Sequence, residues 1–470
     1  MLRPRSLVSS WIKAILLFLV CCGSPTNAQA STSADDKRNI VILLDNHIFT
    51  DQAFKFDEAV LRRNIRAMLE YVRPRRAVAF AVGHDGHAQY PSRIFPSQTP
   101  SAQYPLLQGP PQDLLQLWRE ETERTDTELI IYVSTLRSDA LAALRPDYLR
   151  VFMNGAKATV IDHNTGFIDE ILLPGLQELI ERYDPDGFFL DADYWTVHES
   201  WNKASTDKFE ARFGVPAPKD YADPSYKRFV EFTYDSYRND YVEKLSRFFA
   251  KQSKPLNWAI NAAFTFRDPS PVPENYGTIT SDLPFFALGE AYVESLFGQR
   301  QQKESEIVYA LFAQSEGVGA IQYKSAAQLR QELAVAIANR SLVSFYLPLG
   351  NDGTISLGRI EPAIRAYDEI ERSVGVDPKK PDDHLIANVA LINVNADAVS
   401  RRDFSALRSL SLQLFENGTS HSIISDSLAK NGRFSHLIFP SMNEVVDPGL
   451  LPALGKEGKH VLWTLNRAQA

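Results

Sequence analysis

The chain has 470 residues, of which 44% are hydrophobic, and a formal net charge of −8. This length allows a substantial core, divided between two domains. The acidic balance and the lack of a basic run argue against nucleic acid or an anionic membrane as partner, and favour a neutral or weakly charged substrate.

Residues 1–30 have the features of a secretory signal peptide. Basic residues open the segment, the apolar run AILLFLVCC follows, and AQA (Ala28–Ala30) fits a small-residue cleavage site. The apolar run is too short to favour a membrane span. A lipoprotein signal at Cys21 or Cys22 is the alternative. We therefore expect a secreted or periplasmic protein with no membrane attachment after cleavage, in which residues 31–38 form a short linker.

Cleavage would change the chemistry of the chain in two ways. Both cysteines lie in the leader, so the mature protein would have no disulfide, thiolate metal site or cysteine nucleophile. The leader also carries three basic and no acidic residues, so its loss takes the net charge from −8 to −11.

Strand-like apolar runs alternate with helical patterns between residues 39 and 372. The runs, in chain order, are NIVILL (39–44), RAVAFAV (76–82), ELIIYVS (128–134), DGFFLD (186–191), LNWAINAA (256–263), GTITSDL (277–283), EIVYALF (306–312), VGAIQY (318–323) and LVSFYLP (342–348). Continuous apolar strands separated by helices indicate a parallel sheet covered on both faces. Roughly eight strands over this length predict a (β/α)8 TIM-like barrel, with an open doubly wound α/β sheet as the competing fold.

A second α/β unit is expected after a proline-rich, charged linker at residues 373–384. Residues 385–470 contain four strand-like runs, LIANVALINV, SHSIISD, FSHLIFPS and KHVLWTL, with helical stretches between some of them. This pattern predicts a small Rossmann-like or flavodoxin-like domain. It has no G-x-G-x-x-G or Walker motif, so we expect no nucleotide and no other cofactor.

The stretch DPDGFFLDADYW (Asp184–Trp195) places carboxylates and aromatic residues around a short apolar strand. Because side chains alternate along a strand, Gly187, Phe189 and Asp191 share one face. Asp191 ends the strand, where catalytic side chains of barrel enzymes project. Aromatic rings pack on sugar faces, and a carboxylate can attack the anomeric carbon. The alternative is that Asp191 only caps a helix or pairs with an arginine.

The segment YDPDGFFLDADYW resembles the strand-end motif Y-x-P-D-G-x-W-F-D-G of α-L-fucosidase-like barrels, whose last aspartate is the nucleophile. Asp191 matches that position, whereas Ala192 replaces the following glycine. GHDGHAQYPS (83–92) and IDHNTGFIDEILLPGLQELIERY (161–183) resemble a related bacterial group of hypothetical glycosyl hydrolases. In that group a domain similar to the β-galactosidase trimerisation domain often follows the barrel. The resemblance implies a polysaccharide or oligosaccharide substrate and allows a homo-oligomer.

Glycoside hydrolysis needs a second carboxyl group. We expect Glu290 to be the acid/base, because an apolar neighbourhood such as that of Phe285 and Phe286 raises the pKa of a carboxyl group. Asp282, at the end of the preceding strand, is expected to bind or position the substrate. The alternative for Glu290 is that it begins a helix and interacts with its dipole.

Further substrate-binding candidates follow the strand ends or, for Asn164, rest on the resemblance. They are His47, His84, His87, Tyr90, Asn164, Asp193, Trp195 and Asn261. His84 and His87 have no third partner that would indicate a metal site, so none is expected. The alternative is that these residues only stabilise the loops in which they lie and do not contact a substrate.

The sequence therefore predicts an exported glycoside hydrolase that uses Asp191 and Glu290 in a retaining mechanism. Such a mechanism places the two carboxyl groups about 5–5.5 Å apart, against about 6.5–9.5 Å for inversion. A catalytically inactive barrel that binds glycans or proteins is the alternative. An acyl-transferring or nucleotide-using enzyme is a weaker one, because the G-x-S-x-G and nucleotide-binding motifs do not occur.

Overall fold

A computed structural model describes most of the chain after residue 36. The described ranges are 37–45, 58–96, 113–191, 197–265, 272–282, 303–314, 321–348, 354–374, 388–393, 405–425, 434–439, 454 and 458–463. Across these ranges, no helix combines the length and the apolar character that a membrane crossing requires.

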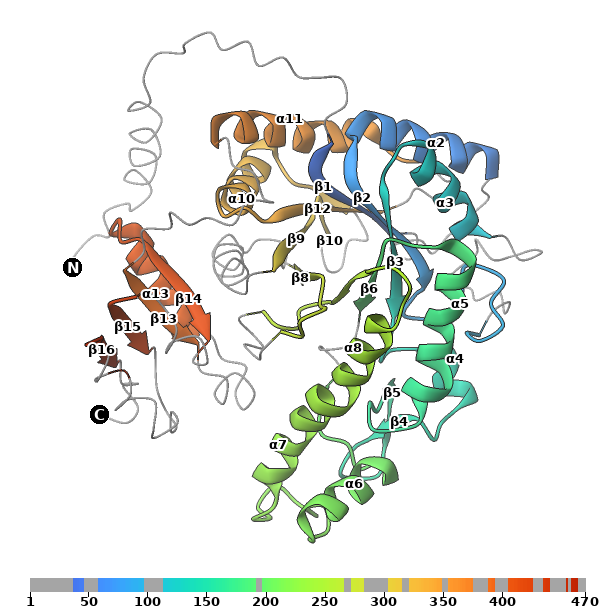
Figure 1. Ribbon diagram of the computed structural model, residues 1–470, viewed down its shortest axis with the longest axis vertical. Coiled ribbons are helices and arrows are strands. Elements are labelled where there is room, and N and C mark those ends of the chain that lie inside the picture. The colour runs from blue at the N-terminus through green and yellow to red at the C-terminus, as the bar shows by residue number, and fades with distance from the viewer. Residues whose placement is uncertain are drawn as a thin grey trace, which may run out of the picture. The chain divides into compact units, whose positions relative to one another are not determined.

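Eight parallel strands form a nearly closed barrel (Figure 1). They are β1 (Arg38–Asp45), β2 (Pro74–Val82), β3 (Glu128–Ser134), β6 (Gly187–Asp191), β7 (Asn257–Ile260), β8 (Thr278–Asp282), β9 (Glu304–Ala310) and β12 (Leu342–Pro348). Their order in the sheet is β7-β6-β3-β2-β1-β12-β9-β8, so each strand adjoins its neighbours in the chain. The ends β7 and β8 meet through backbone hydrogen bonds from Gly277 to Trp258 (3.0 Å) and from Ala262 to Thr280 (3.1 Å). The predicted barrel is confirmed.

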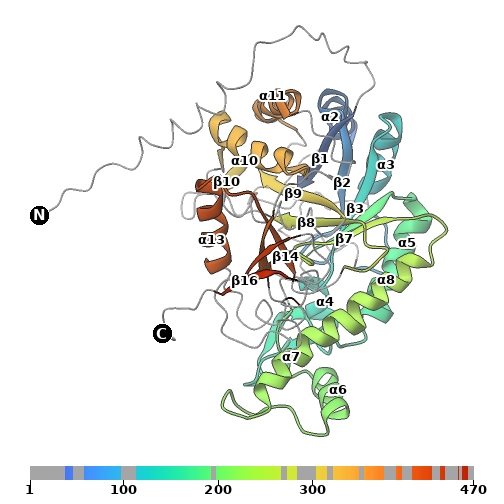
Figure 2. The same ribbon diagram turned by 60° about the vertical axis from the view of Figure 1, so that its left-hand side comes forward.

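Helices cover the outside of the barrel (Figures 1 and 2). They are α2 (Glu58–Val72), α3 (Leu114–Arg124), α5 (Leu173–Tyr183), α8 (Glu243–Ala250), α10 (Ala326–Ala338) and α11 (Leu357–Val374), whereas α7 (Tyr226–Ser236) extends beyond the strands and packs Phe229 and Phe232 against Phe209 (Figure 1). Two π-helical segments, η2 (Ile168–Leu172) and η4 (Tyr237–Val242), run without a break into α5 and α8. The helices and the outward faces of the strands together bury one large apolar core, which includes Ile40, Ile65 and Leu333.

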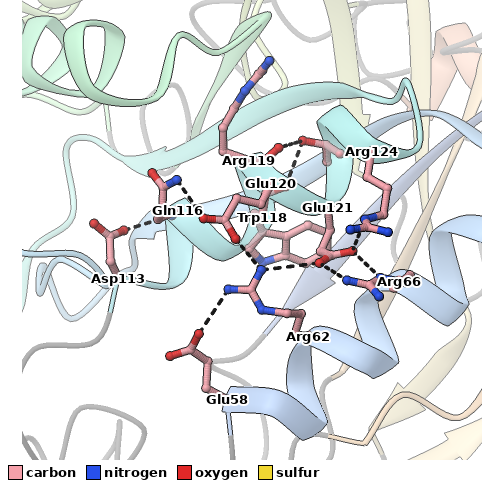
Figure 3. A network of polar contacts seen from close by, with 11 residues as sticks. Glu58, Arg62, Arg66, Asp113, Gln116, Trp118, Arg119, Glu120, Glu121 and Arg124 are labelled. Carbon is pink, nitrogen blue, oxygen red and sulfur yellow. Dashed lines mark hydrogen bonds and ion pairs between the residues drawn. The ribbon is translucent and has the colours of Figure 1, made fainter.

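Polar contacts join the first two covering helices (Figure 3). Arg66 on α2 donates two hydrogen bonds of 2.8 Å to the buried carboxylate of Glu121 on α3. Arg62, one turn earlier, donates to Glu58 (3.1 Å), Glu120 and Glu121. The Arg66 guanidinium is the main cause that holds the pKa of Glu121 below its usual range, despite burial. The paired charges satisfy a carboxylate that burial alone would destabilise.

The inward faces of the strands fill the barrel lumen unevenly. Val41, Phe80, Tyr132, Phe189 and Val308 are among the residues of a separate apolar cluster drawn from strands alone. The β7, β8, β9 and β12 side has polar residues at alternating positions of the same faces, namely Asn257, Thr278, Thr280, Glu304, Glu306 and Ser344. The lumen therefore holds buried polar side chains beside apolar ones.

Two smaller pairs of strands lie outside the barrel sheet. The antiparallel strands β4 (Leu149–Val151) and β5 (Lys157–Ile161) follow the short helix α4 (Asp139–Leu144), and helix α6 (Lys203–Phe213) comes after β6. The run VGAIQY supplies only β11 (Ile321–Tyr323), which pairs antiparallel with β10 (Phe312–Gln314). Its prediction as a strand of the main sheet was wrong, because β9 pairs directly with β12.

The four strand-like runs of the C-terminal region form a separate parallel sheet. Its strands are β13 (Val389–Asn393), β14 (His421–Ser425), β15 (His436–Phe439) and β16 (His460–Trp463), in the order β14-β13-β15-β16. Helix α13 (Ser405–Glu416) connects β13 to β14, and Leu407 packs with Leu391 and Ile423. This sheet confirms the predicted fold class of a barrel followed by a small α/β unit. The exact domain limits stay predictions.

Candidate active site

The carboxyl ends of the barrel strands bring together residues that are far apart in the sequence. Asp45, Asp191 and Asp282 end β1, β6 and β8, while Asn261 directly follows β7. The complete set, which we call the mouth cluster, is Asp45, His84, Tyr132, Ser134, Asp191, Asn261, Asp282 and Tyr346. In (β/α)8 enzymes this end of the barrel carries the catalytic groups.

Asp191 is held by two hydrogen-bond donors and remains accessible. The Tyr132 hydroxyl donates to Asp191 Oδ2 (2.5 Å), and the Asn261 amide donates to Asp191 Oδ1 (2.9 Å). Its side chain is 15% exposed, and Nε2 of His84 lies 3.6 Å from Asp191 Oδ2. No described arginine or lysine forms an ion pair with it, so the carboxylate is oriented without being neutralised.

Backbone geometry fixes where Asp191 emerges. A Cβ atom on Gly187, at the start of β6, would lie 1.9 Å from the carbonyl oxygen of Asn257. The glycine therefore permits β6 and β7 to pair closely, with Gly187 opposite Asn257. Asp186, just before the strand, accepts a hydrogen bond from the Leu129 amide (2.8 Å) at the opposite end of the barrel.

Asn261 links two of the acidic residues. Its amide nitrogen donates to Asp191 Oδ1 at 2.9 Å and to Asp282 Oδ2 at 2.6 Å. Because both bonds meet at one nitrogen, the two carboxylate oxygens can be no more than about 5.5 Å apart. Asn261 is 1% exposed, so the link is rigid and shielded from water.

His84 presents a lone pair to the site. Ser134 donates its hydroxyl proton to the Arg137 carbonyl (2.8 Å), so it accepts from His84 Nδ1 (3.0 Å). In the neutral ring this assignment leaves Nε2 unprotonated, 3.6 Å from Asp191 Oδ2. Burial, ahead of the opposing charge of Asp191, lowers the His84 pKa. A neutral His84 is suited to accept a hydrogen bond from a substrate hydroxyl.

A third carboxylate, Asp45, accepts a hydrogen bond from the Tyr346 hydroxyl on β12. Burial, and after it the charge of Asp45, raises the pKa of Tyr346 well above its usual value, with smaller contributions from Asp282 and Asp191. Burial likewise raises the pKa of Tyr132, followed by Asp191 and then Asp45. Both phenols therefore stay protonated as donors, and the charges of all three carboxylates reach the Tyr346 phenol.

Two of the expected substrate-binding residues are occupied elsewhere. His87 Nδ1 lies 2.8 Å from Asp85 Oδ2, and this hydrogen bond raises the His87 pKa. Tyr90 is 1% exposed, and its hydroxyl donates to Glu178 on α5 (3.0 Å). The structure does not bring either side chain to Asp191, because the loop after β2 turns outward toward α5.

Asn164 and His163 belong to a different buried network. The Asn164 amide donates to Ser205 on α6 (3.0 Å) and Ser236 on α7 (3.2 Å), and its oxygen accepts from Lys208 (3.2 Å). His163 Nε2 lies 2.9 Å from the Ser236 hydroxyl. Burial lowers the His163 pKa to about 4. These contacts join the loop after β5 to α6 and α7, so Asn164 has a structural setting away from the mouth cluster.

Four of the predicted site residues lie outside the described residues. They are His47, Asp193, Trp195 and the predicted acid/base Glu290. In the described part of the chain, no three His, Cys, Asp or Glu side chains are grouped so as to hold a metal ion.

Four members of the mouth cluster were not predicted from sequence: Asp45, Tyr132, Ser134 and Tyr346. The signal for Asp45 was the one used for Asp191, an acidic residue that ends an apolar strand. Tyr132 and Ser134 alternate on one face of ELIIYVS, and Tyr346 is the polar residue near the end of LVSFYLP. Polar positions near the end of each strand are thus a usable sequence signal for this kind of site.

One known protein family matches the part of the chain that contains Asp191. The Alpha-L-fucosidase family matches residues 75–214, which include β2, β3, β6 and Asp191. No curated protein matches the chain in sequence. The family match supports a glycoside hydrolase.

Solved structures share the fold at low sequence identity. α-L-Fucosidase isoenzyme 2 from Paenibacillus thiaminolyticus has a TM-score of 0.70 and 19% identity over 92% of this chain, which spans 64% of that protein. The β-galactosidase from Marinomonas ef1 has a TM-score of 0.64 and 12% identity, over 90% of this chain and 75% of that one. A GH42 β-galactosidase from G. stearothermophilus has a TM-score of 0.65 and 12% identity, over 90% and 71%. The chain thus has a fucosidase-like TIM barrel.

Proposed function

We propose that the protein is a glycoside hydrolase that cleaves an oligosaccharide or polysaccharide with retention of anomeric configuration, using Asp191 as nucleophile. One observation carries the proposal: Asp191 is an accessible strand-end carboxylate, oriented by Tyr132 and Asn261 and not paired with any described arginine or lysine. A nucleophile needs this combination of fixed direction and free charge.

In the first step an Asp191 oxygen forms a bond to the anomeric carbon while the bond from that carbon to the leaving oxygen breaks. A second carboxyl group gives its proton to the leaving oxygen. Water then attacks the anomeric carbon, the second group takes up the proton of that water, and the bond to Asp191 breaks. The Tyr132 and Asn261 donors stabilise the carboxylate that departs in this second step.

The second carboxyl group comes from β8 or the segment after it. The sequence predicts Glu290 for this role. Asp282 is the described alternative, because one of its oxygens lies no more than about 5.5 Å from an oxygen of Asp191, too near for the roughly 6.5–9.5 Å typical of inverting enzymes. The Asp282→Asn and Glu290→Gln variants separate the two. The acid/base variant should lose activity on a poor leaving group and keep its first step on an activated aryl glycoside, whereas a positioning variant should weaken both.

The experiment that tests the function is a screen of the purified protein against aryl α- and β-glycosides of common neutral sugars. Turnover of one substrate, with the product released first as the same anomer by NMR, would support a retaining hydrolase. Release of the opposite anomer would contradict retention. Binding of a glycan without turnover of any substrate would favour the catalytically inactive barrel.

We also propose that the protein is exported with removal of residues 1–30, on the strength of the basic start, apolar run and AQA site of that segment. Amino-terminal sequencing of the exported protein tests this: a start at Ser31 is the expected result. Association into a homo-oligomer remains a proposal that the mass of the purified protein in solution would decide.

A further inference from the structure

A carboxyl group that the proposed mechanism does not use lies inside the barrel lumen. Glu306 on β9 is 4% exposed, and its neighbours Ile307 and Tyr309 pack outward while Val308 packs inward. Alternation therefore directs Glu306, like Val308, into the lumen. Among the described residues, Glu306 Oε1 has no hydrogen-bond partner.

Two hydroxyl groups beside Glu306 are also buried and have no hydrogen-bond partner among the described residues. Thr280 on β8 pairs in register with Glu306, and Ser344 on β12 lies close enough to Glu306 to lower its pKa. Thr280 Oγ1 and Ser344 Oγ are both buried and, within the described structure, without a partner. We call Thr280, Glu306 and Ser344 the lumen polar cluster. Buried polar atoms of this kind are commonly satisfied by internal water.

Charges around Glu306 do not neutralise it. Arg76 on β2 acts on Glu306 as a positive charge, but its guanidinium forms ion pairs with Glu128 (2.7 Å) and Glu304 (2.5 Å). The other charges that act on Glu306 are those of Glu304 on the same strand and Asp282 on β8. Burial is the main cause that raises the Glu306 pKa to about 7, and the two acidic neighbours add to it.

The lumen polar cluster lies directly beneath the mouth cluster. Thr280 and Asp282 share one face of β8, two residues apart, and Asp282 accepts the Asn261 amide. Asn261 Oδ1 is itself buried and lacks a partner among the described residues. Polar groups therefore continue from Glu306 through Thr280 to Asn261 and Asp282.

We propose that Glu306 is a positioning residue of this site: it shares one proton with Asp282 through water held by the Thr280 and Ser344 hydroxyl groups. When the proton moves from the Glu306 carboxyl to the Asp282 carboxylate, Glu306 becomes the anion and the total charge is unchanged. The shared proton thereby sets the charge that faces Asn261. The proposal builds on the proposed function, but its first test needs no substrate.

That test is a pH titration of the full-length protein labelled with ¹³C at the glutamate carboxyl carbon and followed by NMR. One carboxyl signal should titrate near pH 7 and vanish in Glu306→Gln. In Asp282→Asn its midpoint should fall, because the variant removes a neighbouring negative charge. In Thr280→Val the midpoint should rise, because the hydroxyl that holds water is replaced by a methyl group.

Ser281→Ala is the matched control, since residue 281 lies on the outward face of β8. It should leave the midpoint unchanged. The proposal is overturned if Glu306→Gln removes no signal that titrates near pH 7, or if the midpoint is the same in wild type, Asp282→Asn and Thr280→Val. Circular dichroism of each variant establishes that the comparison is made between folded proteins.

A second readout joins this inference to the reaction. For an aryl glycoside that the enzyme turns over, Glu306→Gln should move the alkaline limb of the kcat/KM profile to lower pH. The variant removes the negative charge of ionised Glu306, and that charge raises the pKa of the carboxyl group that protonates the leaving oxygen. KM should stay unchanged, since Glu306 does not reach the substrate; an unchanged alkaline limb would contradict the positioning role. If no glycoside is turned over, the proposed function fails, whereas the NMR titration still decides whether Asp282 and Thr280 control the ionisation of Glu306.

Discussion

The side-chain amide nitrogen of Asn261 lies 2.9 Å from Asp191 Oδ1, and the same nitrogen donates to Asp282 at 2.6 Å. One neutral group thus fixes the proposed nucleophile to a second acidic residue from a different strand. Without it, two carboxylates that close would repel each other and rotate apart.

Asn261→Ala should lower kcat/KM about 30- to 100-fold, a loss of about 2–3 kcal/mol of transition-state stabilisation, because Asp191 loses a donor and its fixed position. Steady-state kinetics on an aryl glycoside measure this. Asn257→Ala is the control: Asn257 lies at the other end of β7, where its side-chain oxygen accepts a hydrogen bond from Thr278 (3.0 Å). Equal losses in the two variants would show that general damage to β7 is the cause.

Tyr132→Phe should lower kcat/KM about 10- to 100-fold. The variant removes the hydroxyl that donates to Asp191, but keeps the ring that stacks between Phe80 (centroids 3.9 Å apart) and Phe189 (5.7 Å). The melting temperature should therefore change little. Tyr346→Phe removes the hydroxyl that donates to Asp45 and should lower kcat/KM less. A larger loss in Tyr346→Phe would indicate that Asp45, and not Asp191, is the reacting carboxylate.

Much of this site was predictable because strands and their ends leave a local signal. Asp191, Asn261 and Asp282 each follow an apolar run, and parallel strands bring such positions to one rim. His87, Tyr90 and Asn164 could not be placed in the same way, since a loop after a strand can turn toward the mouth or toward the helices, and residue spacing does not encode the direction. Glu306 was hidden for another reason: it opens the run EIVYALF, whose apolar character conceals one polar position in the lumen.

Gly187→Ala should lower the free energy of unfolding by about 2–4 kcal/mol, because the new Cβ would lie 1.9 Å from the backbone oxygen of Asn257. Backbone atoms of two paired strands would have to separate, and Asp191 at the end of β6 would shift with them. Chemical denaturation measures the change. Gly358→Ala on α11, where a Cβ meets nothing within 4 Å, should change stability by less than about 1 kcal/mol. Similar values for the two variants would contradict the close approach.

His163 should make the protein less stable in mild acid. Burial lowers its pKa to about 4 in the folded protein, against an ordinary value of 6.5. Between these two pKa values, His163 is protonated in the unfolded chain but neutral in the folded protein. The free energy of unfolding should therefore fall by roughly 2–3 kcal/mol as the pH drops from about 6.5 to about 4. Denaturation at several pH values should show a shallower slope in His163→Gln. An unaltered slope in His163→Gln would refute this assignment.

The most direct test of the central claim is the turnover of an aryl glycoside by Asp191→Asn beside Asp186→Asn. Both variants neutralise an aspartate of the same short segment, but Asp191 ends β6 in the mouth cluster, whereas Asp186 lies at the opposite end near Arg119. Asp191→Asn should abolish turnover while it still binds the glycan, and Asp186→Asn should keep most of the wild-type rate. Full turnover by Asp191→Asn would show that Asp191 is not the nucleophile and would contradict the proposed mechanism.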